Sequence, residues 1–180
     1  KTEEKESDLP KSDLLYYKDH YTKNFDGKVI WSKNNGDNSE IILDKTCFYP
    51  EGGGQPADKG FFTKNGSTFP VKRVYKQNGS VIHVVEGDLK KGDMVYGEID
   101  WDRRYMLMKH HTGTHVVNGA LRKVLGEHVW QAGSQLHITD ARFDFSHYEP
   151  LNEEKIEEIE NLANDFIQQK IDVEKKIMDR

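Results

Sequence analysis

The sequence has a single cysteine, Cys47, and no apolar run long enough to cross a membrane. Because a disulfide needs two cysteines, an intramolecular disulfide framework is excluded and nothing points to an oxidising compartment. The opening residues, 1–10, are rich in charged side chains, whereas a signal peptide needs a basic stretch followed by an apolar one. We therefore expect a cytoplasmic protein without membrane attachment.

The chain also lacks the basic excess that is typical of dedicated nucleic-acid-binding domains. Its 26 Lys and Arg residues stand against 31 Asp and Glu residues, which gives a net charge of −5. Basic residues do gather in two local clusters, Lys72, Arg73 and Lys76, and Arg103, Arg104 and Lys109. Charge runs more often mark solvated faces than binding sites, so we interpret both clusters first as surface.

Short apolar and β-branched runs, separated by turn signals, occupy the chain up to about residue 100. These runs are Lys28–Trp31, Ile41–Leu43, Phe61–Thr63, Val71–Tyr75, Val81–Val85 and Met94–Ile99. Asn-Gly pairs at 35–36, 65–66 and 78–79 fit tight hairpin turns, which need positive φ. We predict a charged linker over residues 1–13 and a small antiparallel β-barrel over residues 14–100.

After Trp101 the apolar spacing changes to three and four, which predicts a helix of about six turns that stops at Gly126. Two strands should follow, His128–Ile138 and Ala141–Phe145, and then a helix capped by Asn152. Its expected inner face is Ile156, Ile159, Ala163, Phe166 and Ile167, and a last strand is expected over Ile171–Met178. The predicted fold class is therefore α+β, with a barrel followed by a core of helix, antiparallel strands, helix and strand over residues 101–180.

Two histidines one helical turn apart, His111 and His115, are the sharpest local feature. Residues i and i+4 share a helical face, so both imidazoles can be aimed at one zinc ion, while His110 points elsewhere. The segment HHTGTH contains no Glu, which excludes the HExxH metalloprotease pattern. Gly113 costs about 1 kcal/mol in a helix relative to Ala, which suggests a close approach to the backbone. Two histidines with unrelated roles are the alternative.

A glycine-rich segment, Thr46–Gly60, is the second feature. Its three consecutive glycines, Gly52, Gly53 and Gly54, permit a backbone path and a close ligand approach that larger residues would block. The absence of a following Gly-Lys-Ser/Thr excludes a phosphate-binding P-loop. A long turn between strands is the alternative interpretation.

Taken together, these segments resemble the editing domain of alanyl-tRNA synthetases of the archaeal type and the related free-standing AlaX proteins. The resemblance rests, in this order and spacing, on LDKTCFYPEGGGQPADKG (Leu43–Gly60), HHTGTH (His110–His115), WQAGSQL (Trp130–Leu136) and ARFDFSHYEPL (Ala141–Leu151). It implies a zinc-dependent domain that hydrolyses mischarged Ser-tRNA(Ala) and Gly-tRNA(Ala). The implied partners are the acceptor end of tRNA(Ala) and the aminoacylation domain of the same polypeptide.

The resemblance also implies roles for individual residues. His111 and His115 match two zinc ligands, and the family's other two, in a Cys-x-x-x-His motif, would lie beyond residue 180. Thr46 matches a threonine that distinguishes serine from alanine, and Gln55 matches a glutamine near the active site. Gly52, Gly53 and Gly54 match the loop that binds the substrate.

Because only half of that zinc site falls within the chain, we expect a C-terminally truncated domain with little deacylase activity of its own. Two other functions stay open at this point. One is a non-catalytic tRNA-binding or assembly module, and the other is a free-standing deacylase.

Overall fold

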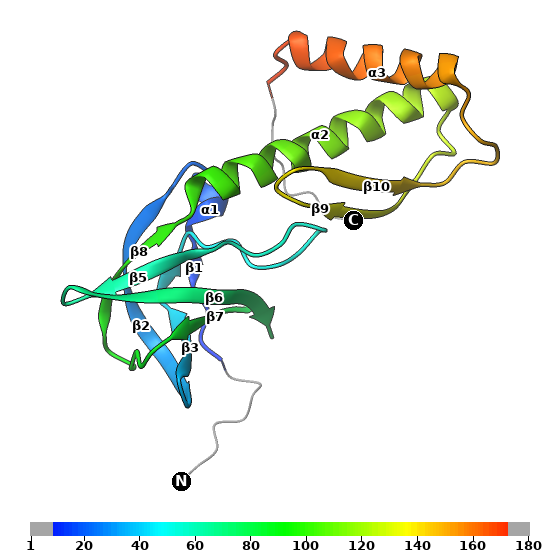
Figure 1. Ribbon diagram of the computed structural model, residues 1–180. Helices are drawn as coiled ribbons and strands as arrows, with labels where there is room; N and C mark the ends of the chain where they lie inside the picture. Colours follow the sequence, from blue (N-terminus) through cyan, green and yellow to red (C-terminus); the bar gives the residue numbers. More distant parts are fainter. Residues whose placement is uncertain (1–8, 173–180) are drawn as a thin grey trace. The chain divides into compact units, whose positions relative to one another are not determined.

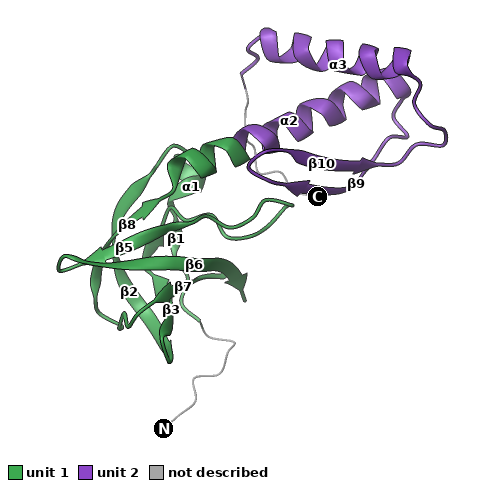
Figure 2. Ribbon diagram, viewed as in Figure 1, with its two compact units in different colours: residues 1–107 green, residues 108–180 purple. Residues whose placement is uncertain are grey.

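The computed structural model describes residues 9–172, and the chain divides into two compact units (Figures 1 and 2). The first unit comprises residues 1–107 and the second residues 108–180. The long helix α2, Trp101–Leu125, begins in the first unit and continues in the second. Among the residues described, no helix combines the length and the apolar character needed to span a bilayer.

Six strands of the first unit form a closed barrel in the order β2-β3-β7-β6-β5-β8, and all neighbours are antiparallel. They are β2 (Asn24–Asn35), β3 (Asn38–Leu43), β5 (Gly60–Lys64), β6 (Ser67–Gln77), β7 (Ser80–Glu86) and β8 (Met94–Ile99). Each contains one of the six predicted runs, so the predicted barrel is confirmed. Closure pairs every strand on both sides and leaves the barrel no open edge.

The tight turns fall where the Asn-Gly pairs predict them. Asn65 and Gly66 have φ of 50° and 79°, and Asn78 and Gly79 have φ of 51° and 81°. Two consecutive positive φ values define a type I′ turn, whose twist matches that of the flanking strands. These turns connect β5 to β6 and β6 to β7, and Gly36, with φ of 77°, lies in the turn between β2 and β3.

Aromatic side chains fill the middle of the barrel. The Phe48 and Phe62 ring centroids lie 5.1 Å apart, and the His83 ring lies 5.6 Å from each. All three side chains are fully buried. The short strand β1 (Asp13–Leu14) pairs in parallel with β4 (Lys45–Thr46), and the single-turn helix α1 (Leu15–Lys18) follows it.

The second unit packs the later part of α2 with the hairpin of β9 (Gln131–Leu136) and β10 (Ala141–Phe145) and with α3 (Glu153–Gln168). As predicted, Gly126 ends α2, with φ of 114°, and the Asn152 side chain caps α3 by accepting the Lys155 N–H at 2.9 Å. The unit's buried core is Ala120, Leu121, Val129, Ile159 and Ala163.

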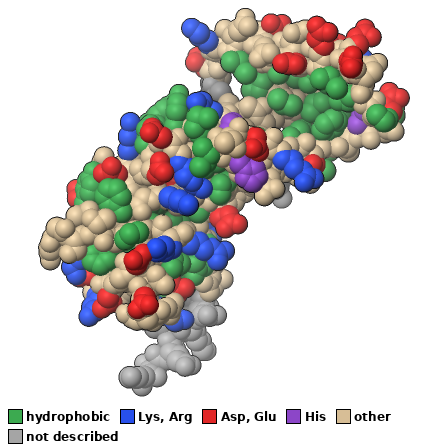
Figure 3. Space-filling model, viewed as in Figure 1, with side chains coloured by type: hydrophobic (Ala, Val, Ile, Leu, Met, Phe, Trp, Pro, Cys, Tyr) green, Lys and Arg blue, Asp and Glu red, His purple; other side chains and the backbone are tan. Residues whose placement is uncertain are grey.

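The apolar face of α3 is only partly covered, which departs from the sequence-based expectation. Ile159 and Ala163 are buried, but Ile156 and Ile167 are 50% and 59% exposed. Both exposed residues line a cavity of about 590 Å³ between α2, β10 and α3, where apolar side chains gather (Figure 3). The predicted last strand falls mostly on residues 173–178, outside the described residues.

Candidate functional site

The three glycines form a closed turn on the surface of the first unit. The Gly52 N–H donates to the Gln55 carbonyl at 3.1 Å, and the Gln55 N–H donates to the Gly52 carbonyl at 3.0 Å. Gly53 and Gly54, with φ of 61° and 77°, form a two-residue turn of the type I′ kind. All three glycines are exposed, whereas Gln55 is 4% exposed and anchors the turn. The substrate-binding role of the glycines and the catalytic role of Gln55 stay predictions.

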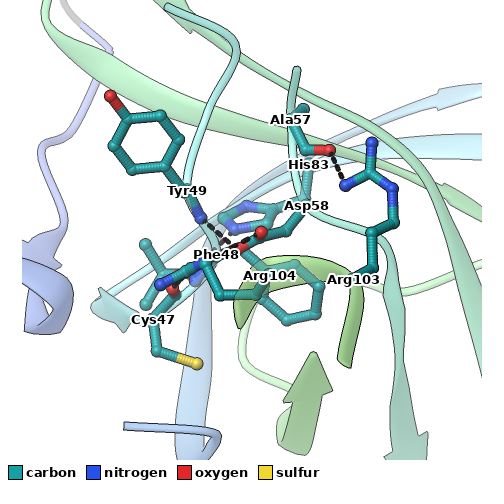
Figure 4. Close-up of polar contacts among 9 residues, drawn as sticks. Cys47, Phe48, Tyr49, Ala57, Asp58, His83, Arg103 and Arg104 are labelled. Atoms are coloured by element: carbon teal, nitrogen blue, oxygen red, sulfur yellow. Dashed lines mark hydrogen bonds and ion pairs between the residues drawn. The ribbon is translucent and has the colours of Figure 1, made fainter. Parts of the chain in front are cut away.

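A buried ion pair fixes both ends of this segment (Figure 4). The Arg104 Nε lies 2.8 and 2.9 Å from the two carboxylate oxygens of Asp58, and its Nη2 also contacts Asp58 Oδ2. The same Nη2 donates to the Cys47 carbonyl at 2.6 Å, while Asp58 Oδ2 accepts the Tyr49 N–H at 2.7 Å. One guanidinium group therefore holds the chain before and after the glycines.

A second guanidinium group reinforces this clamp, which we define as Arg103, Arg104 and Asp58. The Arg103 Nη1 donates to the Ala57 carbonyl at 2.8 Å, so the first turn of α2 makes both attachments. The interpretation of Arg104 as part of a surface cluster is wrong, because its side chain is 2% exposed. Its position three residues before the buried Leu107, on the same helical face, was the signal that could have shown this.

The Thr46 side chain, on β4, is fully buried and bonded to a histidine of the barrel strand β7 that the sequence did not single out. The Thr46 Oγ1 lies 2.9 Å from His83 Nε2, and it accepts the Phe48 N–H at 3.1 Å. The His83 Nδ1 lies 3.4 Å from the Ile41 carbonyl, which can only accept, so a neutral ring carries its proton on Nδ1. The Thr46 hydroxyl therefore donates to His83 Nε2 and keeps one acceptor lone pair.

Burial decides the chemistry of His83 and Cys47. It lowers the pKa of His83 to about 4, because no opposite charge offsets the loss of hydration of the imidazolium. It raises the pKa of the Cys47 thiol to about 12, although the Arg104 charge acts in the opposite direction. Cys47 therefore stays protonated at neutral pH and is poorly suited to act as a nucleophile or a metal ligand.

The buried His83 predicts a pH dependence of stability. An unfolded chain binds the His83 proton at pH values below about 6.5 and the folded chain only below about 4, so the stability that neutral His83 contributes is complete above pH 6.5. It is lost as the pH falls between these values, by about 2 kcal/mol from pH 7 to pH 5. Urea unfolding at the two pH values measures the loss, and His83→Gln, which cannot titrate, should reduce it by that amount. An equal pH dependence in both proteins would contradict the assignment.

In the second unit, His111 and His115 lie side by side on α2, as their spacing predicts. Their ring centroids are 5.2 Å apart and the rings are stacked, with an interplanar angle of 24°. His115 is exposed and His111 is half-buried. Loss of hydration, and secondly the neighbouring His115, lower the pKa of His111, which favours its neutral form.

Neutral imidazoles are the form that binds zinc, so the pair fits two positions of a zinc site. Within residues 9–172 there is no group of three or more His, Cys, Asp or Glu side chains that could hold a metal. The described residues therefore provide two ligands where protein zinc sites have three or four.

The neighbours of the pair have separate roles. The His110 Nδ1 lies 2.7 Å from the His137 carbonyl, to which it must donate, and so ties α2 to the end of β9. At Gly113 a Cβ would meet nothing within 4 Å, which also holds for Gly119 on the same helix. Among the described residues, nothing therefore approaches the α2 backbone closely at Gly113.

Comparison with known proteins identifies the family. The family model of class II (A) tRNA synthetases matches residues 1–103. The alanine–tRNA ligase of Ignicoccus hospitalis is 48% identical over 90% of this chain and 18% of its own length, and that of Pyrococcus abyssi is 51% identical over 89% and 17%. The alanine–tRNA ligase of Methanobrevibacter smithii is 41% identical over 100% of this chain and 20% of its own length. The chain thus spans about a fifth of the relatives it matches. Because the family model covers more than half of the sequence, the chain belongs to the class II (A) tRNA synthetases.

Proposed function

We propose that the chain is an editing portion of an alanyl-tRNA synthetase and hydrolyses the ester of mischarged Ser-tRNA(Ala) and Gly-tRNA(Ala). Its similarity to alanine–tRNA ligases supports tRNA(Ala) as the tRNA that it acts on. The observation that carries the proposal is the His111–His115 pair, with ring centroids 5.2 Å apart, because two imidazoles on one helical face suit a hydrolytic zinc site.

Such a function is needed because amino acids of similar size are difficult to distinguish by binding alone. A synthetic site that accepts alanine can exclude the smaller glycine or the similarly sized serine by only about 1–3 kcal/mol. A second, hydrolytic site removes the wrong products. An aminoacyl ester is already activated, so the site has to position a water molecule and stabilise the oxyanion that develops.

The chain's own residues suit parts of this task. Gly53 and Gly54 present backbone amides on an exposed turn, where N–H groups can donate to an ester oxygen or a developing oxyanion. The clamp holds that turn in place, so the amides are oriented before the substrate binds. His111 and His115 would hold zinc, which, when bound, supplies a Lewis acid for ester hydrolysis.

Release of free serine from Ser-tRNA(Ala), with Ala-tRNA(Ala) as the matched correct substrate, tests the proposal. We expect a slow release that requires added zinc, because the described residues provide two ligands only. That same shortage favours a second candidate function, a tRNA-binding module without catalysis. Binding of tRNA(Ala) without any zinc-dependent hydrolysis would support the second function and refute the first.

A substitution of Thr46 tests how serine is selected. The Thr46 hydroxyl proton is directed at His83, so the remaining lone pair of the Thr46 oxygen can accept a hydrogen bond only from a ligand group that donates one, as a serine hydroxyl does. Thr46→Val should therefore slow hydrolysis of Ser-tRNA(Ala) by about tenfold, the equivalent of about 1.4 kcal/mol. The alanyl and glycyl esters should change far less, and Thr46→Ser, which keeps the hydroxyl, should retain the selectivity. A uniform loss with all three esters would instead indicate damage to the barrel.

The glycine turn offers a test with an internal control. Gly52 has no positive φ, and a Cβ there meets only the Pro50 carbonyl at 4.0 Å. Gly52→Ala should leave stability unchanged and slow hydrolysis if the substrate approaches the turn closely. Gly53→Ala and Gly54→Ala should each cost about 1–2 kcal/mol of local stability because of their positive φ. Full activity in Gly52→Ala would remove this glycine from the substrate site.

A further inference from the structure

Outside the clamp and the histidine pair, the first unit carries a row of aromatic rings on its surface. The row consists of His20, Tyr21, Trp101 and Tyr105, and we call it the aromatic ladder. Successive ring centroids are 5.0, 5.9 and 5.8 Å apart. The Lys23 ammonium lies over the Trp101 ring, 4.7 Å from its centroid.

The ladder joins two parts of the chain that are distant in sequence. His20, Tyr21 and Lys23 belong to the segment between α1 and β2, whereas Trp101 and Tyr105 are one turn apart at the start of α2. Trp101 is half-buried against the barrel core, which fixes the ladder to the barrel. Tyr21 and Tyr105 are 56% and 42% exposed, so both side chains are accessible from solvent.

We propose that the aromatic ladder binds unpaired nucleotides of RNA, with bases stacking on Tyr21 and Tyr105 and Lys23 contacting a phosphate. Rows of exposed aromatic side chains beside basic groups are the usual means by which proteins bind single-stranded nucleic acid. Stacking needs only a ring face, which every base has, so such a surface tolerates any sequence. If the proposed function holds, the ligand is the unpaired acceptor end of tRNA.

Two of the acidic residues beside the ladder have hydrogen-bond partners within the protein. The Asp19 carboxylate accepts the Tyr21 N–H at 2.9 Å and the Thr22 hydroxyl at 3.3 Å. The Asp100 carboxylate accepts the Arg103 N–H at 3.1 Å at the start of α2. Both carboxylates are therefore directed at protein donors, whereas Lys23 is exposed and lies on the ladder.

The start of α2 also links the ladder to the glycine turn. Trp101 and Tyr105 share one side of the helix, and Arg103 and Arg104, between them in sequence, hold the segment that contains the turn. The helical turn that carries the ladder therefore also holds both ends of the glycine-rich segment.

Binding of uncharged RNA to the full chain tests the proposal. The probes are a fluorescently labelled single-stranded oligoribonucleotide and the same sequence paired in a blunt hairpin. We expect preference for the single strand, and about tenfold weaker binding for Tyr21→Ala and for Tyr105→Ala. Tyr21→Phe and Tyr105→Phe, which keep the ring, should bind normally. Lys23→Gln should make the slope of log affinity against log salt about 0.7 shallower.

The control is Tyr96→Ala, at an exposed tyrosine of β8, which should not affect binding. Unchanged affinity in the Tyr21 and Tyr105 alanine variants, an equal loss in Tyr96→Ala, or no RNA binding by the unaltered chain would each overturn the proposal. Chemical labelling of a longer synthetase relative without RNA gives a further test. If the ladder is protected there, the surface is a protein interface and the proposal is overturned. The RNA in this binding assay carries no aminoacyl ester, so the result does not depend on deacylase activity. Binding that requires the ladder, in a chain without deacylase activity, would refute the proposed function and leave the ladder proposal standing.

Discussion

Replacing Arg104 with methionine is expected to lower the free energy of unfolding of the first unit by about 3–5 kcal/mol. Methionine fills a similar volume but leaves Asp58, whose side chain is 0% exposed, as a buried charge without its partner. The Cys47 carbonyl also loses its donor. The start of the glycine-rich segment would then be released from α2, and its end would be held by the Arg103–Ala57 hydrogen bond without the ion pair, so the exposed turn should become more sensitive to proteolysis as well.

Urea unfolding measures the first effect, and cleavage by a nonspecific protease measures the second. Arg103→Met is the matched control on the same helical turn. It removes one hydrogen bond to the Ala57 carbonyl and should cost only about 1 kcal/mol. The double variant Arg104→Met, Asp58→Leu should recover part of the stability, because replacing a buried ion pair with apolar groups is often nearly neutral. A loss below about 1 kcal/mol in Arg104→Met would show that the ion pair does not support the fold.

The barrel could be predicted from the sequence because each of its strands is a local pattern. Apolar residues alternate over short runs, and Asn65-Gly66 and Asn78-Gly79 supply the positive φ that hairpins need. The two longer helices follow from local signals too, such as the Asn152 cap and the Gly126 stop. Residues close together in the sequence determine all these features, so they can be predicted from the sequence alone.

Contacts between distant residues could not be predicted in the same way. Arg104 and Asp58 are 46 positions apart, and Thr46 and His83 are 37 apart, so no spacing rule connects them. The basic cluster at Arg103 and Arg104 was therefore interpreted as surface, although these side chains hold the glycine-rich segment. The aromatic ladder could not be predicted for the same reason, because its members His20 and Tyr105 lie far apart in the sequence.

The candidate zinc site has one part that could be predicted from local sequence and one part that could not. A spacing of four on a helix is local, and it places the His111 and His115 rings together as expected. The number of further ligands depends on residues brought in by tertiary structure, and the described residues contain no third one.

Zinc binding by the chain is expected to depend on His111 and His115 but not on His110. The unaltered chain should bind zinc weakly, since the described residues offer two ligands, and His111→Ala or His115→Ala should weaken it further by at least about tenfold. His110→Ala removes a hydrogen bond to the His137 carbonyl, which should cost about 1 kcal/mol of stability and leave zinc affinity unchanged. Competition with a chromophoric chelator measures the affinities, and thermal unfolding separates metal loss from misfolding. Equal loss of zinc affinity in all three variants would mean that His110 also faces the metal, which would contradict its hydrogen bond to the His137 carbonyl. Tight stoichiometric zinc in the unaltered chain would require ligands beyond the described residues.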